Sequence, residues 1–258
     1  MLQVYGIVIA CSKYKEYDAI IDLLTDRNVF PIWVRGAYKP NSKFIGYLPL
    51  LTRGKYEVYT GGYKYSKLRD AVIDNSLIPF YKSENTLVYY SLIKELFTLT
   101  FSPDITNRFF NVMNETIDES MNHIDLSYVT LNYIANLIRI IGYGLNVQNF
   151  ENAVAIDFSN GCFADKEHFD EINMIYLEKN EVELIHDLFT YSQKEMSSRT
   201  NNVATNVKLI ELLCDFIIFY NGIEIKSLDY LKYLESSLIV GWQIRKNNIK
   251  LLSRLINI

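Results

Sequence analysis

The spacing of apolar residues changes near residue 80, and this change constrains the fold more than any other feature. Before it, apolar and polar residues alternate in short runs separated by glycines, which is typical of β-strands. From about Ser83 the apolar residues recur every three or four positions in longer runs, which is typical of amphipathic helices. We therefore predict an α+β chain, with a strand domain over residues 1–80 and a mainly α-helical domain over residues 81–258.

The first 80 residues predict a small barrel. Residues 2–11, 28–36 and 50–73 are rich in β-branched and apolar side chains, whereas the apolar spacing of residues 17–26 fits either a short helix or a strand. The pair Gly61-Gly62 predicts a two-residue hairpin turn, since glycine readily adopts positive φ. Several short strands joined by glycine turns favour a closed barrel, which has no exposed edge.

The sequence after residue 80 predicts helices, with one exception. Leu131, Ile134, Ile138 and Ile141 fall on one face of a helix that Gly142 would end. The segment from residue 146 to about 175 is less periodic, so we expect a small irregular insert with a hairpin there. Further helices are predicted within residues 84–101, 104–121, 126–144, 180–192 and 206–222, and again from residue 227.

Charge is unevenly distributed along the chain. Residues 1–80 carry 11 basic and 7 acidic side chains, residues 81–235 carry 11 and 23, and residues 236–258 carry 4 and 0. The two basic ends indicate a polyanionic partner, although an ordinary fluctuation of charge between segments explains the pattern equally well. The acidic middle is poorly suited to DNA and better suited to protein contacts.

The sequence contains few signs of catalytic or metal chemistry. It lacks the common phosphate-binding, dinucleotide-binding, serine-hydrolase and zinc-protease motifs, and it gives no positive reason to expect an enzyme. The three distant cysteines suit a reducing cytosol, and neither a signal peptide nor a stretch of membrane-spanning length is recognisable. Cys162 and His168 would form at most half of a zinc site, which needs four ligands.

A basic loop is the main candidate site. In "VRGAYKPNSKF" (residues 34–44) cations recur every four residues, but Gly36 and Pro40 argue against a helix. Cations neutralise phosphates and aromatic rings stack on bases, so a barrel with both suits single-stranded nucleic acid. Alternatively, the rings fill the barrel and the cations only favour solubility. The candidates are Arg35, Lys39, Lys43, Arg53 and Lys55 for phosphates and Tyr38, Phe44 and Tyr47 for bases.

Short motifs in the right order resemble the RecO family of bacterial recombination mediators. The family's opening strand is followed by a Gly-Glu-x-Asp segment, then a Gly-Ala-basic-x-x-Ser-basic loop and a Leu-x-Pro turn. The segments "LIRIIGYGLNV" and "FIIFYNGIEIKSLDYL" resemble its central helix and closing pattern. The matching residues are Glu16 and Asp18 (with Lys15 in place of the glycine), Gly36, Ala37, Lys39, Ser42 and Lys43, Leu48 and Pro49, and Gly222, Lys226, Ser227 and Leu231.

The resemblance implies an N-terminal OB-fold barrel and a helical C-terminal domain in a cytoplasmic, nucleoid-associated protein of DNA repair and recombination. It implies binding of single- and double-stranded DNA and annealing of complementary strands. It also implies that the protein acts with RecR to load the recombinase RecA onto DNA coated with single-stranded-DNA-binding protein, so that its relation to RecA is indirect. It implies no catalytic site. The family often has a four-cysteine zinc motif, of which only Cys162 survives here, so we expect no metal and no cofactor.

Two further cationic sites are hypotheses from the residues themselves. Arg139 is alone among apolar residues and would suit a pocket for the acidic tail of single-stranded-DNA-binding protein, or it pairs with a carboxylate of the acidic segment. A basic stripe on one side of a predicted helix would be a second DNA contact; alternatively, it is only a solvated helix face. The stripe consists of Arg245, Lys246, Lys250 and Arg254. Two rival functions stay open, an OB-fold RNA-binding protein and a scaffold whose barrel binds only protein.

Overall fold

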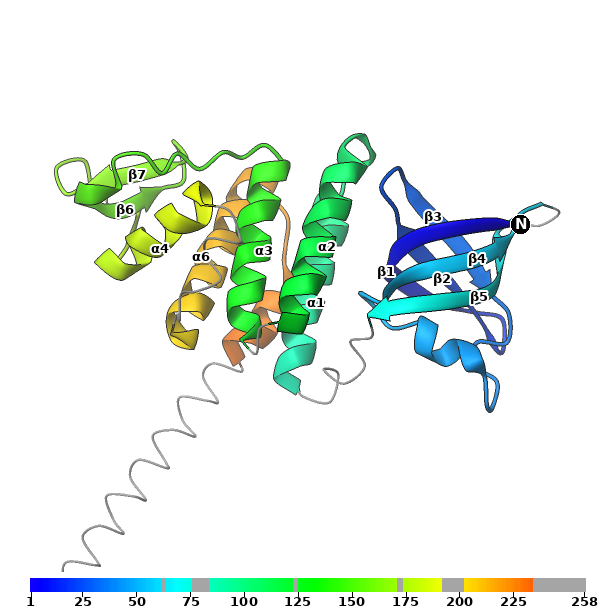
Figure 1. Ribbon diagram of the computed structural model, residues 1–258. Coiled ribbons are helices and arrows are strands. Elements are labelled where there is room, and N and C mark those ends of the chain that lie inside the picture. Colours follow the sequence, from blue (N-terminus) through cyan, green and yellow to red (C-terminus); the bar gives the residue numbers. More distant parts are fainter. Residues whose placement is uncertain (62–63, 76–83, 123–124, 171–173, 192–201, 234–258) are drawn as a thin grey trace, which may run out of the picture.

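The computed structural model describes residues 1–61, 64–75, 84–122, 125–170, 174–191 and 202–233. A closed five-stranded barrel is followed by a group of helices, with a small sheet at the far side of the helices (Figure 1). The α+β class predicted from the change in apolar spacing is therefore confirmed. The barrel strands are β1 (Leu2–Tyr14), β2 (Asp18–Leu24), β3 (Val29–Val34), β4 (Arg53–Tyr59) and β5 (Ser66–Asn75).

The barrel closes because β1 is long enough to pair on both sides. Its first half pairs antiparallel with β4 and its second half with β2, so the strand order is β1-β2-β3-β5-β4 and back to β1. The pair β3–β5 is parallel. This order, with one parallel pair, is the OB-fold topology. Gly6 and Gly54 face each other in the β1–β4 ladder.

Alternating side chains fill the barrel. Ala19, Ile21 and Leu23 of β2 point inward and are buried, as are Ile32 and Val34 of β3. Residues 17–26, whose spacing fitted a helix or a strand, thus supply a strand because alternate apolar positions face one core.

The hairpin predicted around Gly61-Gly62 is confirmed, since β4 and β5 pair antiparallel, but its connection is longer than two residues, and Gly62 lies outside the described residues. In the β4–β5 ladder Tyr59 pairs with Lys67, so residues 60–65 connect the two strands. Gly61 does have positive φ, at 106°. Tyr65 is in this connection, and its ring lies edge-on to that of Tyr14.

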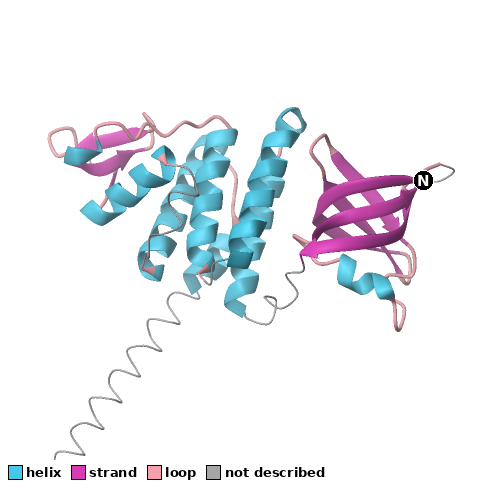
Figure 2. Cartoon of the chain, in the orientation of Figure 1, coloured by secondary structure: helices cyan, strands magenta, loops and turns pink. Residues whose placement is uncertain are grey.

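The helical part is built around α3, which packs against α1, α2 and α6 (Figure 2). Leu131, Ile134 and Ile138 of α3 are all buried, and Gly142 follows the helix with φ 88°. No described helix is long and apolar enough to cross a membrane. Residues 226–233 are also helical, and the named helices are α1 (Glu84–Thr100), α2 (Thr106–Asn122), α3 (Leu126–Ile140), α4 (Lys179–Thr190) and α6 (Val203–Asn221).

The less periodic segment forms a small antiparallel sheet in the order β7-β6-β8. A short 3-10 helix, η4 (Phe150–Asn152), leads into it, and β6 contacts α4. The expected hairpin is thus the β6–β7 pair, to which the structure adds a third strand. The strands are β6 (Ala153–Asp157), β7 (Cys162–Asp165) and β8 (Met174–Tyr176).

One end of the barrel lies against α2. Ile7, Leu24 and Leu51 of the barrel belong to the same buried cluster as the cores of the helices. Tyr5 of β1 meets Phe110 of α2 edge-on, with 6.4 Å between ring centroids. The expected boundary near residue 80 falls within residues 76–83, outside the described residues, so the division into two domains stays a prediction.

Candidate nucleic-acid interface

The basic loop is anchored to the turn between β1 and β2, at the barrel end away from α2. The backbone N–H of Gly36 donates to Asp18 Oδ1 (2.7 Å), and that of Tyr38 donates to the carbonyl of Tyr17 (2.9 Å). Gly36 has φ 69°, which favours glycine, and Ala37 between the two anchors is buried. The loop then enters a 3-10 helix, η1 (Lys43–Tyr47), capped by the Ser42 hydroxyl. The loop therefore has a fixed shape.

The cations of the loop differ in their surroundings. Arg35, Lys39 and Lys55 are exposed, and no acidic side chain in the described part of the chain forms an ion pair with them. The Lys43 ammonium lies 3.0 Å from Asp70, and its hydrogen bond, helped by one from the Ala71 backbone, lowers the pKa of that carboxyl. An exposed pair of this kind is weak, so a phosphate can compete for Lys43.

Arg53 occupies a different place from the one expected of a phosphate-binding cation. Its guanidinium donates to Asp118 Oδ1 (2.6 Å) and to the backbone carbonyl and Oδ1 of Asn114 (3.3 Å each), all on α2. The Arg53 side chain is only 12% exposed. It ties the barrel to the helices, and it is not part of the interface that we propose.

The predicted aromatic residues divide into two groups. Phe44 and Tyr47 pack against the barrel core and meet edge-on, with ring centroids 6.0 Å apart. For these two rings, the alternative that they fill the barrel fits the structure. Tyr38 is 39% exposed, and its hydroxyl lies 3.6 Å from the Cys11 thiol; this hydrogen bond raises the pKa of Tyr38.

A second aromatic group on the barrel was not predicted from the sequence. The Tyr14 ring meets those of Trp33 and Tyr65 edge-on, each at 6.4 Å between centroids. The Lys15 ammonium lies 5.3 Å from the Tyr14 centroid and 5.4 Å from that of Trp33, and the Lys64 ammonium lies 5.4 Å from that of Tyr65. We call these five residues the Trp33 cluster. None of its three rings belongs to either buried core of the described residues.

Part of this cluster was recognisable from the sequence. In "VFPIWV" the neighbours Ile32 and Val34 point inward, so strand alternation places Trp33 on the outer surface. Its contact with Tyr14 and Tyr65 was not recognisable, because these residues are on different strands and connections that only the closed barrel brings together.

Arg139, another predicted cation, is on the helical part of the chain and not on the barrel. Arg139 of α3 donates to the Leu188 carbonyl at the end of α4 and to Asn136 Oδ1 (2.6 Å), and it lies over the Phe189 ring. Burial lowers its pKa. Arg139 thus joins α3 to α4 while the residue stays exposed, and its role as the cation of a pocket for an acidic tail stays a prediction. The basic stripe of Arg245, Lys246, Lys250 and Arg254 lies outside the described residues.

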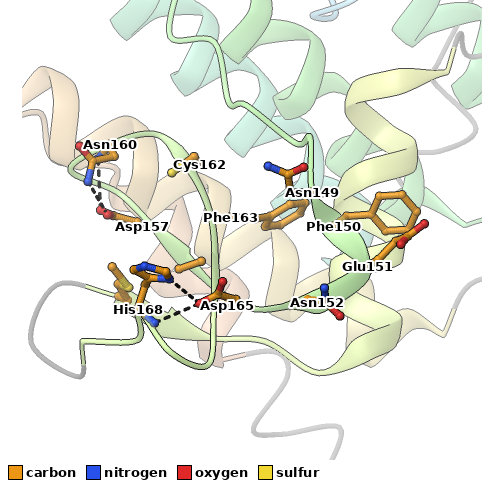
Figure 3. A pocket seen from close by; sticks show the side chains of 12 residues that line it. Asn149, Phe150, Glu151, Asn152, Asp157, Asn160, Cys162, Phe163, Asp165 and His168 are labelled. Atoms are coloured by element: carbon orange, nitrogen blue, oxygen red, sulfur yellow. Dashed lines mark hydrogen bonds and ion pairs between the residues drawn. The ribbon is translucent and has the colours of Figure 1, made fainter.

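The small sheet borders a polar cavity of about 900 Å³ that contains Cys162 and His168 (Figure 3). The His168 ring Nδ1 lies 2.7 Å from Asp165 Oδ1, and Asp157 accepts hydrogen bonds from the backbone and side chain of Asn160. Burial and the nearby Asp157 raise the pKa of the Cys162 thiol.

These residues do not fit the four-cysteine zinc site that the family often has. A structural zinc site takes four ligands, and of the family's four cysteines this chain keeps Cys162. Among the described residues no three His, Cys, Asp or Glu side chains are grouped closely enough to hold a metal ion.

The barrel topology and the attached helices define a class, an α+β protein with an N-terminal OB-type barrel that carries exposed cations. Comparison with known proteins then gives the family. Residues 1–76 match the family model described as "Recombination protein O N terminal". The N-terminal part of the chain thus matches the RecO family, which confirms the resemblance seen in its motifs.

Three relatives named "DNA repair protein RecO" agree with this assignment. The protein of Lactobacillus acidophilus is 24% identical over 145 residues, 55% of this chain and 57% of the relative. That of Lactobacillus helveticus is 28% identical over 100 residues, 38% of this chain and 40% of the relative. That of Clostridium novyi is 22% identical over 247 residues, 90% of this chain and 94% of the relative. The match thus spans about half the length of the two Lactobacillus proteins.

Proposed function

We propose that this chain is a DNA-binding protein of repair and recombination whose barrel binds single-stranded DNA along the basic loop. One observation carries the proposal: Arg35 and Lys39 are exposed on a loop that Asp18 fixes to the barrel end away from the helices. Fixed cations can meet phosphates without further ordering. The names of the relatives support DNA repair as the setting.

The proposed mechanism is electrostatic and non-enzymatic. Two complementary strands repel each other because both are anionic, and a protein that neutralises their phosphates lets the bases meet. Pairing then supplies the free energy, and no covalent bond changes. Exposed Lys55 of β4 and the loop cations Arg35, Lys39 and Lys43 would hold the strand, and Tyr38 is an exposed ring beside them. A second strand would need another cationic surface, for which the stripe at residues 245–254 is the candidate.

The family resemblance supplies the proposed partners. We propose that the protein acts with RecR to load recombinase onto DNA coated with single-stranded-DNA-binding protein, and that the acidic helical part makes these protein contacts. Its charge supports this division, because residues 81–235 carry 23 acidic and 11 basic side chains.

The first experiment measures annealing of two complementary oligonucleotides, each coated with cognate single-stranded-DNA-binding protein. We expect the protein to accelerate annealing, the acceleration to fade with salt, and the Arg35→Ala/Lys39→Ala/Lys43→Ala variant to lose it. The matched control replaces Lys94, Lys166 and Lys179, three exposed cations of the helical part, and removes the same charge.

The outcomes separate the alternatives. Equal loss in both variants would mean that net charge matters and the loop does not. No acceleration by the folded protein at any salt would refute annealing. Direct competition between DNA and RNA of one sequence then tests the RNA-binding alternative, and absence of affinity for either would favour a protein-binding scaffold.

A further inference from the structure

We propose that the polar cavity beside the β6–β7 pair binds an arginine side chain of a partner protein, while an apolar residue of the same segment contacts exposed rings next to it. We call this cavity, drawn in Figure 3, the hairpin cavity. The inference rests on the proposed function, because it gives a partner chemistry to the protein contacts assigned to the helical part. Its volume, about 900 Å³, is in the range of pockets that enclose small groups.

The charges that line the hairpin cavity are mostly negative. Its lining includes the carboxylates of Glu151, Asp157 and Asp165, and no lysine or arginine is among the described lining residues. The basic group there is His168, whose ring Nδ1 already lies 2.7 Å from Asp165 Oδ1. Even with His168 protonated, the lining keeps an excess of negative charge, which favours a cationic ligand.

Asp157 points to a ligand more directly than the net charge does. The residue is only 4% exposed, and its carboxylate accepts hydrogen bonds from the backbone N–H and the side-chain amide of Asn160 (3.1 and 2.7 Å). In the part of the chain that the structure describes, no cation forms an ion pair with it. Because a buried carboxylate is normally paired with a cation, a guanidinium in the cavity would supply the missing positive charge.

Two further lining residues favour arginine over lysine. Glu151 of η4 is exposed, and its carboxylate has no ion pair or hydrogen bond within the described residues. The Phe163 ring of β7 is half-buried in the same lining. A planar guanidinium can donate two hydrogen bonds to one carboxylate and also stack on a ring, whereas an ammonium is a compact point charge.

Exposed aromatic rings are attached to the same pair of strands. The Tyr220 hydroxyl at the end of α6 donates to the carbonyl of Phe158 (2.7 Å), the residue directly after Asp157. Phe219 is 55% exposed, and its ring centroid lies 6.0 Å from that of Phe158. An extended peptide covers about 3.3 Å per residue, so a short segment can place an arginine in the cavity and an apolar side chain on Phe219.

The same charges disfavour acidic partners. An acidic protein tail or the phosphates of DNA would meet three carboxylates at the hairpin cavity. The cavity is therefore separate both from the basic loop of the barrel and from any pocket for an acidic tail at Arg139. A basic, partly apolar protein segment is the occupant that its charge complements.

Cys162 can report on the cavity from within. It is half-buried in the lining, whereas Cys214 is fully buried and burial raises its pKa. In the Cys11→Ser variant of the full chain, a trifluoromethyl thiol reagent should therefore label Cys162 selectively. The probes are three short capped peptides that alternate leucine with arginine, lysine or glutamate. We expect the arginine peptide to shift the fluorine NMR signal and the glutamate peptide to leave it unchanged.

Calorimetric titration of the unlabelled protein measures the affinities. We expect the arginine peptide to bind more tightly than the lysine peptide, and less tightly as salt rises. Glu151→Gln and Phe219→Ala should each weaken its binding about tenfold, because one removes a charge-assisted hydrogen bond and the other an apolar contact. Asp157→Asn should weaken it at least as much, provided that urea unfolding shows the variant to be folded.

Two matched controls remove the same groups elsewhere on the helical part. Asp104→Asn removes an exposed carboxylate of the 3-10 helix η3 (Pro103–Ile105), and Leu99→Ala removes an exposed apolar side chain of α1. Neither should change the affinity for the arginine peptide. Because Glu151 is exposed and unpartnered among the described residues, weaker binding by Glu151→Gln would come from the lost charge and not from unfolding.

The proposed function and this inference fail in different ways. Peptide binding by a protein that neither binds DNA nor anneals it would refute the proposed function and leave the docking site standing. Equal binding of the arginine and glutamate peptides, or full affinity in both Glu151→Gln and Phe219→Ala, would refute the site. Binding that leaves the fluorine signal at Cys162 unchanged would refute its location, and equal affinity for the lysine peptide would overturn the assignment to arginine.

Discussion

Glu119 shows how one residue can make stability depend on pH. Its carboxyl group lies between α2 and α3, with Asn132 Nδ2 2.9 Å from Oε1 and 3.1 Å from Oε2. Burial raises its pKa from 4.5 to about 7, and the nearby Glu115 adds to this. Between these two pH values the folded protein holds a proton that the unfolded chain has released. The contribution of Glu119 to stability is thus complete below pH 4.5 and is lost as pH rises through 7.

We predict that Glu119→Gln makes the protein more stable than wild type above pH 7. The gain should approach about 3 kcal/mol at pH 8 and should be much smaller at pH 5, because a shift of one pKa unit corresponds to about 1.4 kcal/mol. Urea unfolding of both proteins at the two pH values measures it. The same difference in stability at pH 5 and pH 8 would contradict the prediction.

At the scale of elements, the β4–β5 pair depends on close backbone approach at Gly54. The ladder shifts register between Arg53 and Gly54, and a Cβ added at Gly54 would lie 2.3 Å from the Val72 carbonyl oxygen and 2.9 Å from Ile73 Cα. Both neighbours are backbone atoms within a strand, so they cannot move aside without disturbing the barrel.

We predict that Gly54→Ala lowers the free energy of unfolding by more than about 2 kcal/mol, measured by urea titration. Gly46→Ala is the matched control, because no atom lies within 4 Å of a Cβ added there. A Gly54→Ala protein within about 0.5 kcal/mol of wild type would show that the ladder yields more easily than its geometry indicates.

At the scale of the whole molecule, the barrel and the helices share one buried cluster. Ile7, Leu24 and Leu51 are the barrel's members of this cluster, and the Arg53–Asp118 ion pair also joins the barrel to α2. Because neither part can unfold without exposing apolar surface of the other, we expect the two to unfold together.

We predict a single thermal transition in the Trp242→Phe variant, in which Trp33 is the only tryptophan. Trp33 fluorescence reports on the barrel, circular dichroism at 222 nm reports mainly on the helices, and the two midpoints should coincide. Asp118→Ala should lower stability by about 1–2 kcal/mol, since it removes the carboxylate that accepts a 2.6 Å hydrogen bond from the largely buried Arg53 guanidinium. Two separate melting midpoints in the Trp242→Phe variant would mean that the shared cluster does not couple unfolding of the barrel to unfolding of the helices.

The spacing of apolar residues predicted most of the secondary structure, because strand and helix spacing are local properties of the chain. It predicted the barrel strands and the helices, and the motifs around Gly36 and Pro49 indicated the family. It did not predict the length of the connection at residues 60–65, because the ladder between β4 and β5 ends at Tyr59 and Lys67 and not beside the two glycines.

The sequence by itself determined the order of elements, the asymmetry of charge and the presence of a basic loop. Only the tertiary structure decided which neighbours the cations and rings have. Arg53 and Arg139 look like open cations in the sequence but are engaged by Asp118 and by the Leu188 carbonyl, whereas Trp33 acquires Tyr14 and Tyr65 as neighbours. The reason is physical: spacing along a chain fixes which face a side chain occupies, but its partners come from segments that meet only when the barrel closes and packs on the helices.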